Sequence, residues 1–450
     1  MKNFFKVIHN SPESKARLGA ISTENGAIKT PAFVAVGTKG TVKALTPDLV
    51  KSIGTQAAFV NTYHLMTHPG AEIIERAGGI HKYSGLNMPL MSDSGGFQVF
   101  SLARTKTSQN NFYHTRVSQL RDPLESEKIT FASSLKETRK ADVRGYEKPL
   151  LVKITDDGVK FRSTYDGKLI EFTPEKSMEY QAAIGADINM AFDECTYYPS
   201  SHDYASRAMN RTHRWLERCI DYVKSQKSKV KTTTQKLKIE NLDIENSMKI
   251  ENGKLKINQY LYGVIQGGTF EDLRKKSAQF VVKQNTPGVA IGGVSVGETK
   301  REMRDQVRWV SDYLPKDRPV HLLGVGQMDD IIDLVKYGID TFDCVEPTRL
   351  ARMGILYKMS NIKLQMTNKF IILNDKDLTI DITRTEYKNN LEKVDVNCNC
   401  YVCNNFSKSY IHHLFKQREI LGYTLATYHN LWTMERLFEK IRELIENDEL

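Results

Sequence analysis

Three of the six cysteines in this 450-residue chain lie within six consecutive positions, as Cys398, Cys400 and Cys403. Thiolates are strong ligands for zinc, and structural zinc sites take four Cys or His ligands in a tetrahedron. A local disulfide is a poor alternative, because Cys398 and Cys400 are too close to be bridged without strain and a third thiol would stay unpaired. The spacing therefore predicts a zinc site, but it does not choose the fourth ligand among His412, His413 and His429.

A second set of chemically capable residues stands at the ends of short apolar runs. Its members are polar groups or glycines: Asn61, Asp93, Asp193, Gln266, Gly293, Gly324 and Asp343. Ordinary turn chemistry explains any one of them about equally well, since Asp, Asn and Gly are favoured where strands stop. Three carboxylates and a carboxamide on successive strand ends favour a functional site.

These groups suit a flat purine joined to a sugar. Asp93 precedes residues 94–97 (SGGF), whose glycines let a flat ligand approach the backbone and whose phenylalanine can stack on it. Asp193, Gln266 and the backbone N–H of Gly293 place acceptors beside donors, as the edge of guanine requires. Asp343 is then left to act on the sugar, because two separated carboxylates near an anomeric carbon can perform a double displacement.

The elements that must position these groups follow from the apolar pattern. Buried parallel strands are predicted within residues 57–65, 88–96, 186–194, 260–268, 288–294, 319–326 and 339–346. Helices are predicted between them, with Thr173, Thr269 and Thr299 as N-caps. This alternation indicates the α/β class, as a doubly wound open sheet or a closed barrel. No phosphate-binding glycine fingerprint follows the first strand, and polar strand ends converge on one face of a barrel, so we expect a (β/α)8 TIM barrel.

Length and composition limit the compartment and the partners. A chain of this length exceeds the usual limit of roughly 250 to 300 residues for one core, so we expect a large domain with an appendage. The N-terminal segment has no apolar stretch long enough for a membrane span or a signal peptide, and we expect a cytoplasmic protein. The net charge of +10 favours a polyanionic partner.

Six longer segments together resemble the bacterial tRNA-guanine transglycosylases. They are MSDSGGFQVFSL, FTPEKSMEYQAAIGADINMAFDEC, YGVIQGG, IGGVSVGE, GVGQMDDIIDLVKYGIDTFDCVEPTRLARMG and CNCYVCNNFSKSYIHHLFKQREILGYTLATYHN. The resemblance implies a barrel domain over residues 1–385, a zinc-binding subdomain with C-terminal helices completing the barrel over residues 386–450, and a homodimer. It also implies a reaction of queuosine biosynthesis. Guanine at wobble position 34 of the tRNAs for Asp, Asn, His and Tyr is exchanged for 7-aminomethyl-7-deazaguanine.

The resemblance assigns roles to individual residues. Asp343 aligns with the nucleophile that attacks the ribose anomeric carbon, and Asp93 aligns with the proton acceptor for the incoming base. The implied base-binding residues are Asp93, Ser94, Gly95, Gly96, Phe97, Asp193, Gln266, Gly293 and Val294. The implied tRNA-binding residues are Gly324, Thr348, Arg349 and Arg352. The family's structural zinc is held by three cysteines at this spacing and the histidine of the HN pair, which selects His429.

Three features depart from the family pattern or concern the choice of base. Insertions stand at about residues 105–151 and 229–258, and the second, lysine-rich and poor in aromatics, predicts a solvated loop. Eukaryotic relatives, which take the bulky base queuine, have a glycine where Val296 stands. We therefore expect Val296 to narrow the pocket for the smaller aminomethyl base.

Other functions stay open at this point. A non-catalytic RNA-binding subunit on the same scaffold is disfavoured by the joint presence of Asp93, Asp193 and Asp343. A retaining glycosidase would more often show Glu pairs and tryptophan platforms, whereas this chain has three Trp. A transglycosylase for another deazaguanine or another tRNA position is the closest rival.

Overall fold

The computed structural model describes residues 4–97, 151–163, 165–239, 259–358, 366–367, 370–371 and 378–450, with the backbone alone for residues 151–152, 227–239, 366–367 and 370–371. It contains a closed barrel of eight strands, whose order around the barrel is their order along the chain. The barrel strands are β4 (Ala32–Val36), β5 (Ala58–Val60), β6 (Leu90–Ser92), β10 (Ile188–Met190), β11 (Tyr260–Ile265), β12 (Gly288–Ile291), β13 (Val320–Leu322) and β14 (Thr341–Cys344). Neighbouring strands pair in parallel, which confirms the predicted TIM barrel.

Seven of these strands lie within the seven predicted apolar runs, whereas β4 lies outside all of them. Their side chains are buried almost throughout, as expected for strands covered on both faces. A ring cluster shows the packing: Phe438 contacts Phe342 of β14 and Phe33 of β4, at centroid distances of 5.8 and 6.2 Å. Burying one such ring contributes about 2–3 kcal/mol.

The helices between the strands can be compared with the predicted N-cap residues. They are α1 (Pro47–Ile53), α2 (Thr62–Thr67), α3 (Ala71–Arg76), α4 (Ile80–Ser84), α6 (Pro174–Ile184), α7 (His202–Ile239), α9 (Glu271–Lys283), α10 (Lys300–Val310), α11 (Met328–Leu334) and α12 (Glu346–Arg352). Thr173 and Thr299 are N-caps as predicted, and Thr299 forms a capping box with Glu302. The prediction for Thr269 is wrong, because α9 starts one residue later and Phe270 occupies the cap position without a side-chain bond.

Two compact units divide the chain. The first comprises Met1–Phe59, Leu86–Pro89 and Lys316–Leu450, and the second comprises Val60–Gly85 and Leu90–Pro315. The expected boundary near residue 385 stays a prediction.

The first unit contains an antiparallel N-terminal sheet of β1 (Phe5–Asn10), β2 (Arg17–Thr23) and β3 (Gly26–Thr30). Arg17 is buried and forms a two-pronged ion pair with Asp340, with N···O distances of 2.9 and 2.6 Å. Asp340 immediately precedes β14, so the pair fixes the amino end of that strand. In barrels this end carries stability and the opposite end carries chemistry.

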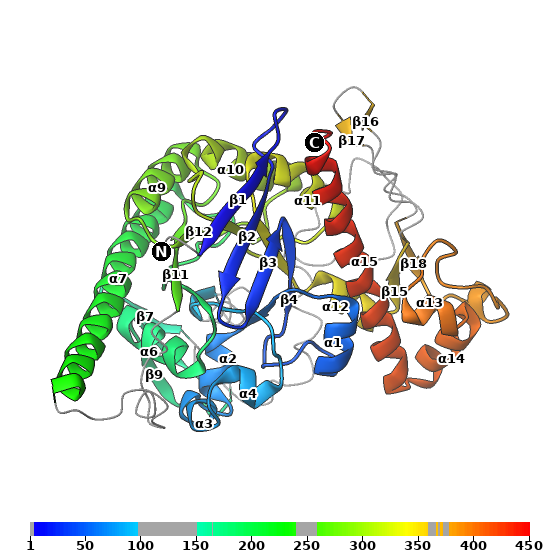
Figure 1. Ribbon diagram of the computed structural model, residues 1–450, viewed down its shortest axis with the longest axis horizontal. Helices are drawn as coiled ribbons and strands as arrows, with labels where there is room; N and C mark the ends of the chain where they lie inside the picture. The colour runs from blue at the N-terminus through cyan, green and yellow to red at the C-terminus, as the bar shows by residue number, and fades with distance from the viewer. Residues whose placement is uncertain are drawn as a thin grey trace. The chain divides into compact units, whose positions relative to one another are not determined.

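The same unit ends in a small C-terminal assembly, drawn from yellow through orange to red in Figure 1. Its elements are β15 (Ile355–Tyr357), β16 (Met366–Thr367), β17 (Phe370–Ile371), β18 (Thr379–Asp381), α13 (Tyr401–Asn405), α14 (Lys408–Gln417) and α15 (Ile420–Glu446). The long helix α15 packs on α12, α1 and β4 as well as on α13 and α14. It therefore joins the barrel wall to the cysteine-bearing segment.

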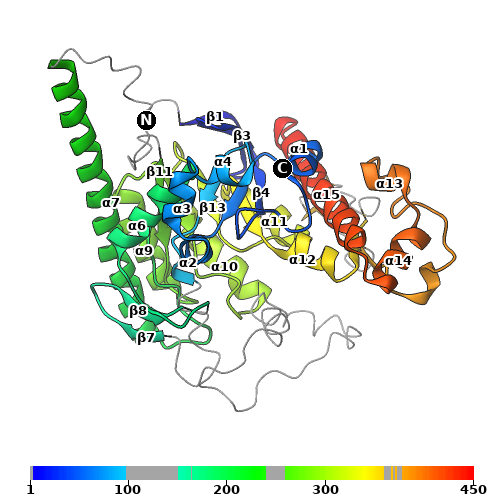
Figure 2. The same ribbon diagram turned by 90° about the horizontal axis from the view of Figure 1, so that it is seen from below.

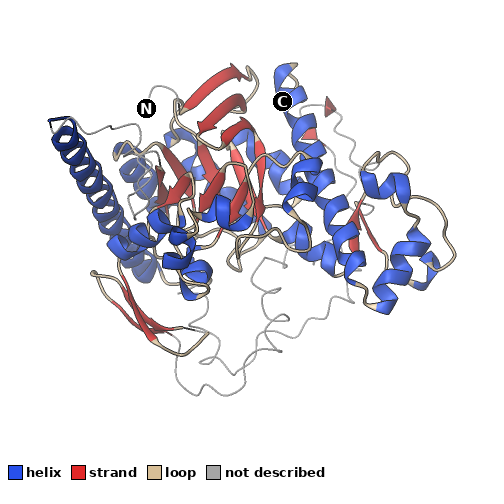
Figure 3. Ribbon diagram, turned by 60° about the horizontal axis from the view of Figure 1, so that its bottom comes forward, coloured by secondary structure: helices blue, strands red, loops and turns tan. Residues whose placement is uncertain are grey.

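The second unit adds a three-stranded antiparallel sheet of β7 (Leu151–Ile154), β8 (Val159–Arg162) and β9 (Leu169–Phe172). Figure 2 shows this sheet beside α6 and the long helix α7, and Figure 3 shows its strands in red. The indole N–H of Trp215 on α7 donates to the carbonyl of Asp156 in the β7–β8 turn, at 2.7 Å. The sheet is thereby fixed to the helix that follows β10.

The two insertions fall mostly on residues that lack a description. The first insertion lies outside the described residues up to residue 150, and residues 240–258 of the second do so as well. Residues 229–239 belong to α7, so the expected loop is wrong for that part. Among the described residues, no helix is long and apolar enough to cross a membrane.

Candidate functional site

The first candidate group lies in the second unit, in the loop after β6 that carries Asp93. The Oδ1 atom of Asp93 accepts hydrogen bonds from the backbone N–H groups of Thr62, at 2.7 Å, and Gly95, at 3.2 Å. The side-chain amide of Asn61, which also caps α2, donates to Oδ2. Three donors thus fix a half-buried carboxylate at a strand end, which is an arrangement suited to proton transfer at a defined position.

The residues after Asp93 bring this loop against the end of β10. The Ser94 hydroxyl donates to Asp193 Oδ1 at 2.9 Å. Gly95 has a φ of +80°, which favours glycine, and a Cβ on Gly96 would lie 2.5 Å from the carbonyl oxygen of Asp193. Gly95 is therefore required by its backbone conformation and Gly96 by the close approach of a neighbouring carbonyl. Phe97 is the last described residue before the gap, and its stacking role stays a prediction.

Asp193 and Gln266 form a buried polar pair at the ends of β10 and β11. The Gln266 Nε2 group donates to Asp193 Oδ2 at 2.7 Å, and both side chains are buried. Burial raises the pKa of Asp193 to about 6, although the hydrogen bonds from Gln266 and Ser94 favour the anion. In the described part of the chain, Gln266 Oε1 has no hydrogen-bond partner. A buried acceptor without a donor is costly, and it marks a place where a ligand donor fits.

The loop after β12 completes this cluster. A Cβ on Gly293 would lie 2.2 Å from Gln266 Oε1, and the residue has a φ of +65°, so only glycine fits there. Val294 is buried and Val296 is half-buried. The buried carboxylate of Glu298 accepts from the backbone N–H groups of Ser295 and Val296, at 2.6 and 2.9 Å, and fixes the loop. Glu298 therefore binds the loop that presents the expected pocket wall.

Arg274 on α9 holds two of these loops together, and sequence reasoning missed it. Its guanidinium is wholly buried and donates to the carbonyl oxygens of Gly268, Gly292 and Gly293 at 2.7, 2.6 and 2.8 Å. It also donates to Gln306 Oε1 at 2.5 Å, and Gln306 in turn bonds Glu298. Burial lowers the pKa of Arg274 to about 10. A charged residue on the core-facing side of an amphipathic helix was the available signal.

A second candidate group, in the first unit, surrounds Asp343 within β14. Asp343 Oδ1 accepts a hydrogen bond from the backbone N–H of Gly324, at 3.0 Å, and lies 3.1 Å from Nε2 of His321 on β13. Gly324 has a φ of +78°. Predicted residues Gly324 and Asp343 are therefore brought together, and His321 is an additional member that the sequence analysis missed.

Cations gather near the same end of the first unit. Arg349 and Arg352 on α12 are half-buried, and Arg352 Nη1 donates to the carbonyl of Thr348 at 2.6 Å. Burial and then repulsion from Arg349 lower the pKa of Arg352. Partial desolvation, followed by repulsion from Arg352, Lys39 and Arg349, lowers the pKa of Lys43. Four like charges within electrostatic range favour a polyanion, and the two lysines are additions to the predicted set. Thr348 is buried and bonds the carbonyl of Val345.

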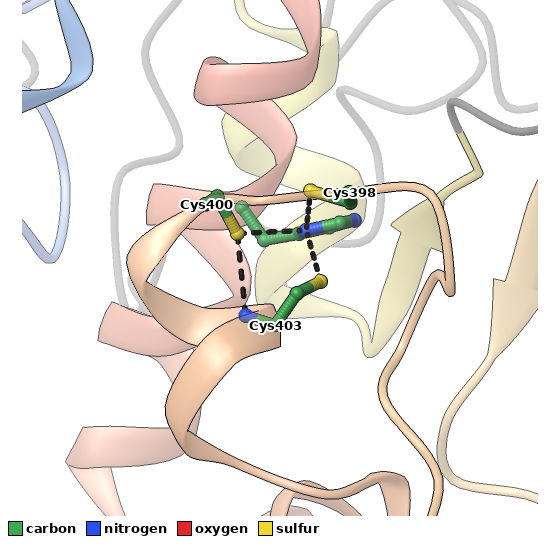
Figure 4. Close-up of side chains that lie close together, drawn as sticks. Cys398, Cys400 and Cys403 are labelled. Carbon is green, nitrogen blue, oxygen red and sulfur yellow. Dashed lines mark hydrogen bonds between the residues drawn. The ribbon is translucent and has the colours of Figure 1, made fainter.

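The cysteine cluster forms a candidate metal centre, and Figure 4 shows Cys398, Cys400 and Cys403 pointing toward one point. His429 on α15 supplies the fourth group, with Nδ1 at 3.8, 3.5 and 3.5 Å from the three sulfur atoms. Tetrahedral zinc would separate N and S ligand atoms by about 3.6 Å, so the four side chains fit that ion.

The neighbours of the cluster support metal binding. All four side chains are buried, and their ligand atoms lie within 4.8 Å of one another. His429 Nε2 donates to the carbonyl oxygen of Tyr357 at 2.8 Å, which leaves the Nδ1 lone pair for the ion. His412 instead contacts the carbonyl of Ile382, and His413 is exposed. The group can hold a metal, and the choice of His429 among the three histidines agrees with the geometry.

Comparison with known proteins identifies relatives along nearly the whole chain. The sequence model of the family described as "Queuine tRNA-ribosyltransferase" matches residues 12–136 and 109–450. A protein named queuine tRNA-ribosyltransferase from Caldanaerobacter subterraneus subsp. tengcongensis is 40% identical over 446 residues, covering 99% of this chain and 94% of the relative. Proteins of the same name from Thermoanaerobacter pseudethanolicus, at 39% with the same coverage, and Lysinibacillus sphaericus, at 35% with 99% and 93% coverage, are also similar.

Proposed function

This chain belongs to the queuine tRNA-ribosyltransferase family of tRNA-modifying pentosyltransferases, and we propose that it exchanges guanine at wobble position 34 of tRNA for 7-aminomethyl-7-deazaguanine. The tRNAs are those for Asp, Asn, His and Tyr. Family membership argues against the glycosidase alternative.

The observation that carries the proposal is the buried Asp193–Gln266 pair. Guanine and its 7-deaza analogue offer a ring N–H and an amino group as donors beside a carbonyl acceptor. Asp193 and the Oε1 atom of Gln266, which is without a partner among the described residues, supply the acceptors. The backbone N–H of Gly293 supplies a donor where no side chain fits. A carboxylate and an amide held in this way reject a base that lacks the donors, because the buried acceptors would remain unpaired.

The chemistry follows as two displacements at the ribose anomeric carbon C1′. In the first, the Asp343 carboxylate bonds to C1′ while the C1′–N9 bond breaks, and guanine leaves with the electron pair and takes up a proton at N9 from Asp93. In the second, the incoming base gives its N9 proton to Asp93, and N9 displaces Asp343 from C1′. The covalent intermediate keeps the RNA chain intact, so neither a redox cofactor nor a nucleoside triphosphate is required.

We assign tRNA binding to a cationic group formed by Lys39, Lys43, Arg349 and Arg352. These side chains would neutralise phosphates near the target nucleotide. The nucleotide must leave its stack, which costs roughly a few kcal/mol and least in a single-stranded anticodon loop. Gly324 and Thr348 are proposed to line the same RNA-facing segment. A homodimer in the cytoplasm is part of this proposal and follows from the family resemblance.

We assign zinc to the Cys3His cluster in a structural role. Cys398, Cys400, Cys403 and His429 would fill all four tetrahedral positions, which leaves none for a reactive water. The ion would cross-link residues 397–403 and helix α15, which carries His429. This link would stabilise the C-terminal assembly.

We assign the selection of base size to Val296. This side chain is half-buried in the loop fixed by Glu298, and the proposal requires it to exclude a bulky 7-substituent. Competition between 7-aminomethyl-7-deazaguanine and queuine tests this assignment. We expect the small base to be incorporated and queuine to be rejected, and Val296→Gly to relax the rejection. Efficient queuine incorporation by the unchanged protein would contradict it.

The proposed function as a whole is tested by base exchange. The protein is incubated with unmodified tRNA and labelled guanine, and the label is then located by nuclease mapping. We expect label at position 34 of the four tRNAs and none with Asp343→Asn. Label at another position would support the rival transglycosylase, and binding of tRNA without any label would support a non-catalytic RNA-binding subunit.

A further inference from the structure

His321 is a wholly buried histidine in direct contact with Asp343. It lies on β13 opposite Thr341 of β14, and Asp343 is two residues further along β14. Because alternate residues of a strand share one face, Thr341 and Asp343 both face the histidine. Its two ring nitrogens contact both of them: Nδ1 lies 2.8 Å from Thr341 Oγ1, and Nε2 lies 3.1 Å from Asp343 Oδ1.

The partners of the two nitrogens determine which one carries the proton. A carboxylate only accepts hydrogen bonds, so Nε2 must be the donor toward Asp343. A threonine hydroxyl can donate, so Nδ1 of a neutral ring accepts from Thr341. Phe59 fixes the plane of the imidazole, with its ring stacked on it at a centroid distance of 5.5 Å and an interplanar angle of 16°. The donor is thus preset in direction and does not require a charged histidine.

The two oxygens of Asp343 consequently differ. Oδ1 receives both the His321 Nε2–H and the Gly324 N–H, whereas no group within the described ranges donates a hydrogen bond to Oδ2. A carboxylate held through one oxygen by two donors has a fixed plane. Its other oxygen keeps its lone pairs for a new bond.

We infer that His321 is the positioning residue for the covalent step, holding Oδ1 of Asp343 so that Oδ2 attacks C1′. This inference rests on the proposed function, in which Asp343 is the nucleophile. The Oδ2–C1′ bond forms as the C1′–N9 bond breaks, and guanine leaves with the electron pair. Guanine takes its N9 proton from Asp93, which regains a proton from the incoming base, and His321 keeps its Nε2 proton throughout. In the second displacement the Oδ2–C1′ bond breaks, and the same two donors stabilise the carboxylate that departs.

Three variants distinguish the effect of the Nε2–H donor from the effect of ring packing. His321→Phe keeps an aromatic ring against Phe59 but has no donor. His321→Gln can place an amide N–H where Nε2 stands. Thr341→Val leaves the histidine in place and removes the hydroxyl that orients its tautomer. Metal content and tRNA affinity of each purified variant show whether the fold is intact.

The measurement is the single-turnover rate of covalent RNA–protein adduct formation on a denaturing gel. We expect His321→Phe to slow adduct formation about 10- to 100-fold at unchanged tRNA affinity, because one hydrogen bond to a charged group is lost. We expect Thr341→Val to slow it several-fold and His321→Gln to recover most of the rate.

Each other outcome contradicts the inference. An unchanged rate in His321→Phe would show that the donor is dispensable. Equal loss in the Phe and Gln variants, with metal content and tRNA affinity intact, would assign the effect to ring packing. If His321→Phe fails to fold, an unchanged rate in Thr341→Val overturns the inference on its own. Failure of the proposed function is distinguishable, because the unchanged protein would then form no adduct at all.

Discussion

Asp193 and Asp343 are carboxylates at barrel strands of the two units, and their neighbours give them opposite properties. Asp193 is buried with both oxygens hydrogen-bonded, Oδ1 to Ser94 and Oδ2 to Gln266, and burial raises its pKa to about 6. Within the described residues, Asp343 accepts hydrogen bonds from His321 and Gly324, and both go to Oδ1. The first arrangement suits a fixed acceptor that reads a base. The second presents one oxygen that can form a bond.

Under the proposed function, position at a strand end does not by itself determine the role of an aspartate. Asp343 lies near the carboxyl end of β14 and Asp193 lies in the loop that follows β10, on the side where barrels place their chemistry. The role is set by which oxygens are already occupied and by which groups occupy them.

Removal of the bond-forming carboxylate should have the largest effect on activity. Asp343→Asn keeps the shape and the bonds to Oδ1 but replaces the nucleophilic oxygen by a weakly nucleophilic amide. Base exchange should fall at least about 10³-fold while tRNA affinity stays within a few-fold. A gel-shift titration and an exchange assay on the same preparation measure both quantities. Retention of more than a tenth of the activity would assign the nucleophile elsewhere.

A change in the metal cluster should lower the stability of the protein and leave the proposed roles of Asp193 and Asp343 unchanged. His429→Ala removes one of four ligands, so bound zinc should be lost and the melting temperature should fall by at least about 5 °C. The matched control is His412→Ala, a buried histidine that is not in the cluster. Metal analysis and thermal unfolding are the readouts. Zinc retained in the first variant and lost in the second would move the fourth ligand.

Asp193 should control base affinity, and its effect should depend on pH. Below about pH 6 a proton converts one oxygen from acceptor to donor, so the KM for the base should rise as the pH falls through that value. Asp193→Asn should raise the base KM about 10- to 100-fold at pH 7.5 and abolish this pH dependence. Steady-state kinetics between pH 5 and 8 measure both. A wild-type KM that is flat across this range would contradict the reading role.

Removing one charge from the cationic group should have the smallest effect, a weakening of tRNA binding that does not depend on the base. Arg352→Gln removes one charge near the RNA, so the slope of log K against log salt should flatten by about one contact. Arg384→Gln is the control, because Arg384 is exposed and pairs with Asp381 outside this group. Fluorescence binding titrations at several salt concentrations give the slopes. Equal slopes for both variants and the unchanged protein would remove Arg352 from the tRNA surface.

The sequence predicts the fold well where periodicity is regular. Strand β4 is not predicted because only Pro31 separates it from the end of β3, and no helix between them marks a new strand. The cysteine spacing predicts the metal cluster because its three thiols are local. Its histidine lies 26 residues beyond Cys403, and only folding brings it to the sulfur atoms.

The site is predictable only for residues at recognisable strand ends. His321 reads as one more buried strand residue, and its contact with Asp343 depends on the pairing of β13 with β14. Arg274 reads as a polar residue of an amphipathic helix. It donates to carbonyl oxygens of two loops, and the approach of these loops to α9 depends on the fold and not on the local sequence.

The most direct test of the division between the two aspartates is identification of the residue that carries RNA. The adduct formed with unmodified tRNA is isolated under denaturing conditions, digested with nuclease and protease, and analysed by mass spectrometry. We predict a ribose-linked nucleotide on the peptide that contains Asp343, and none on peptides that contain Asp93 or Asp193. A nucleotide attached to Asp193 or Asp93 would contradict the assignment of roles.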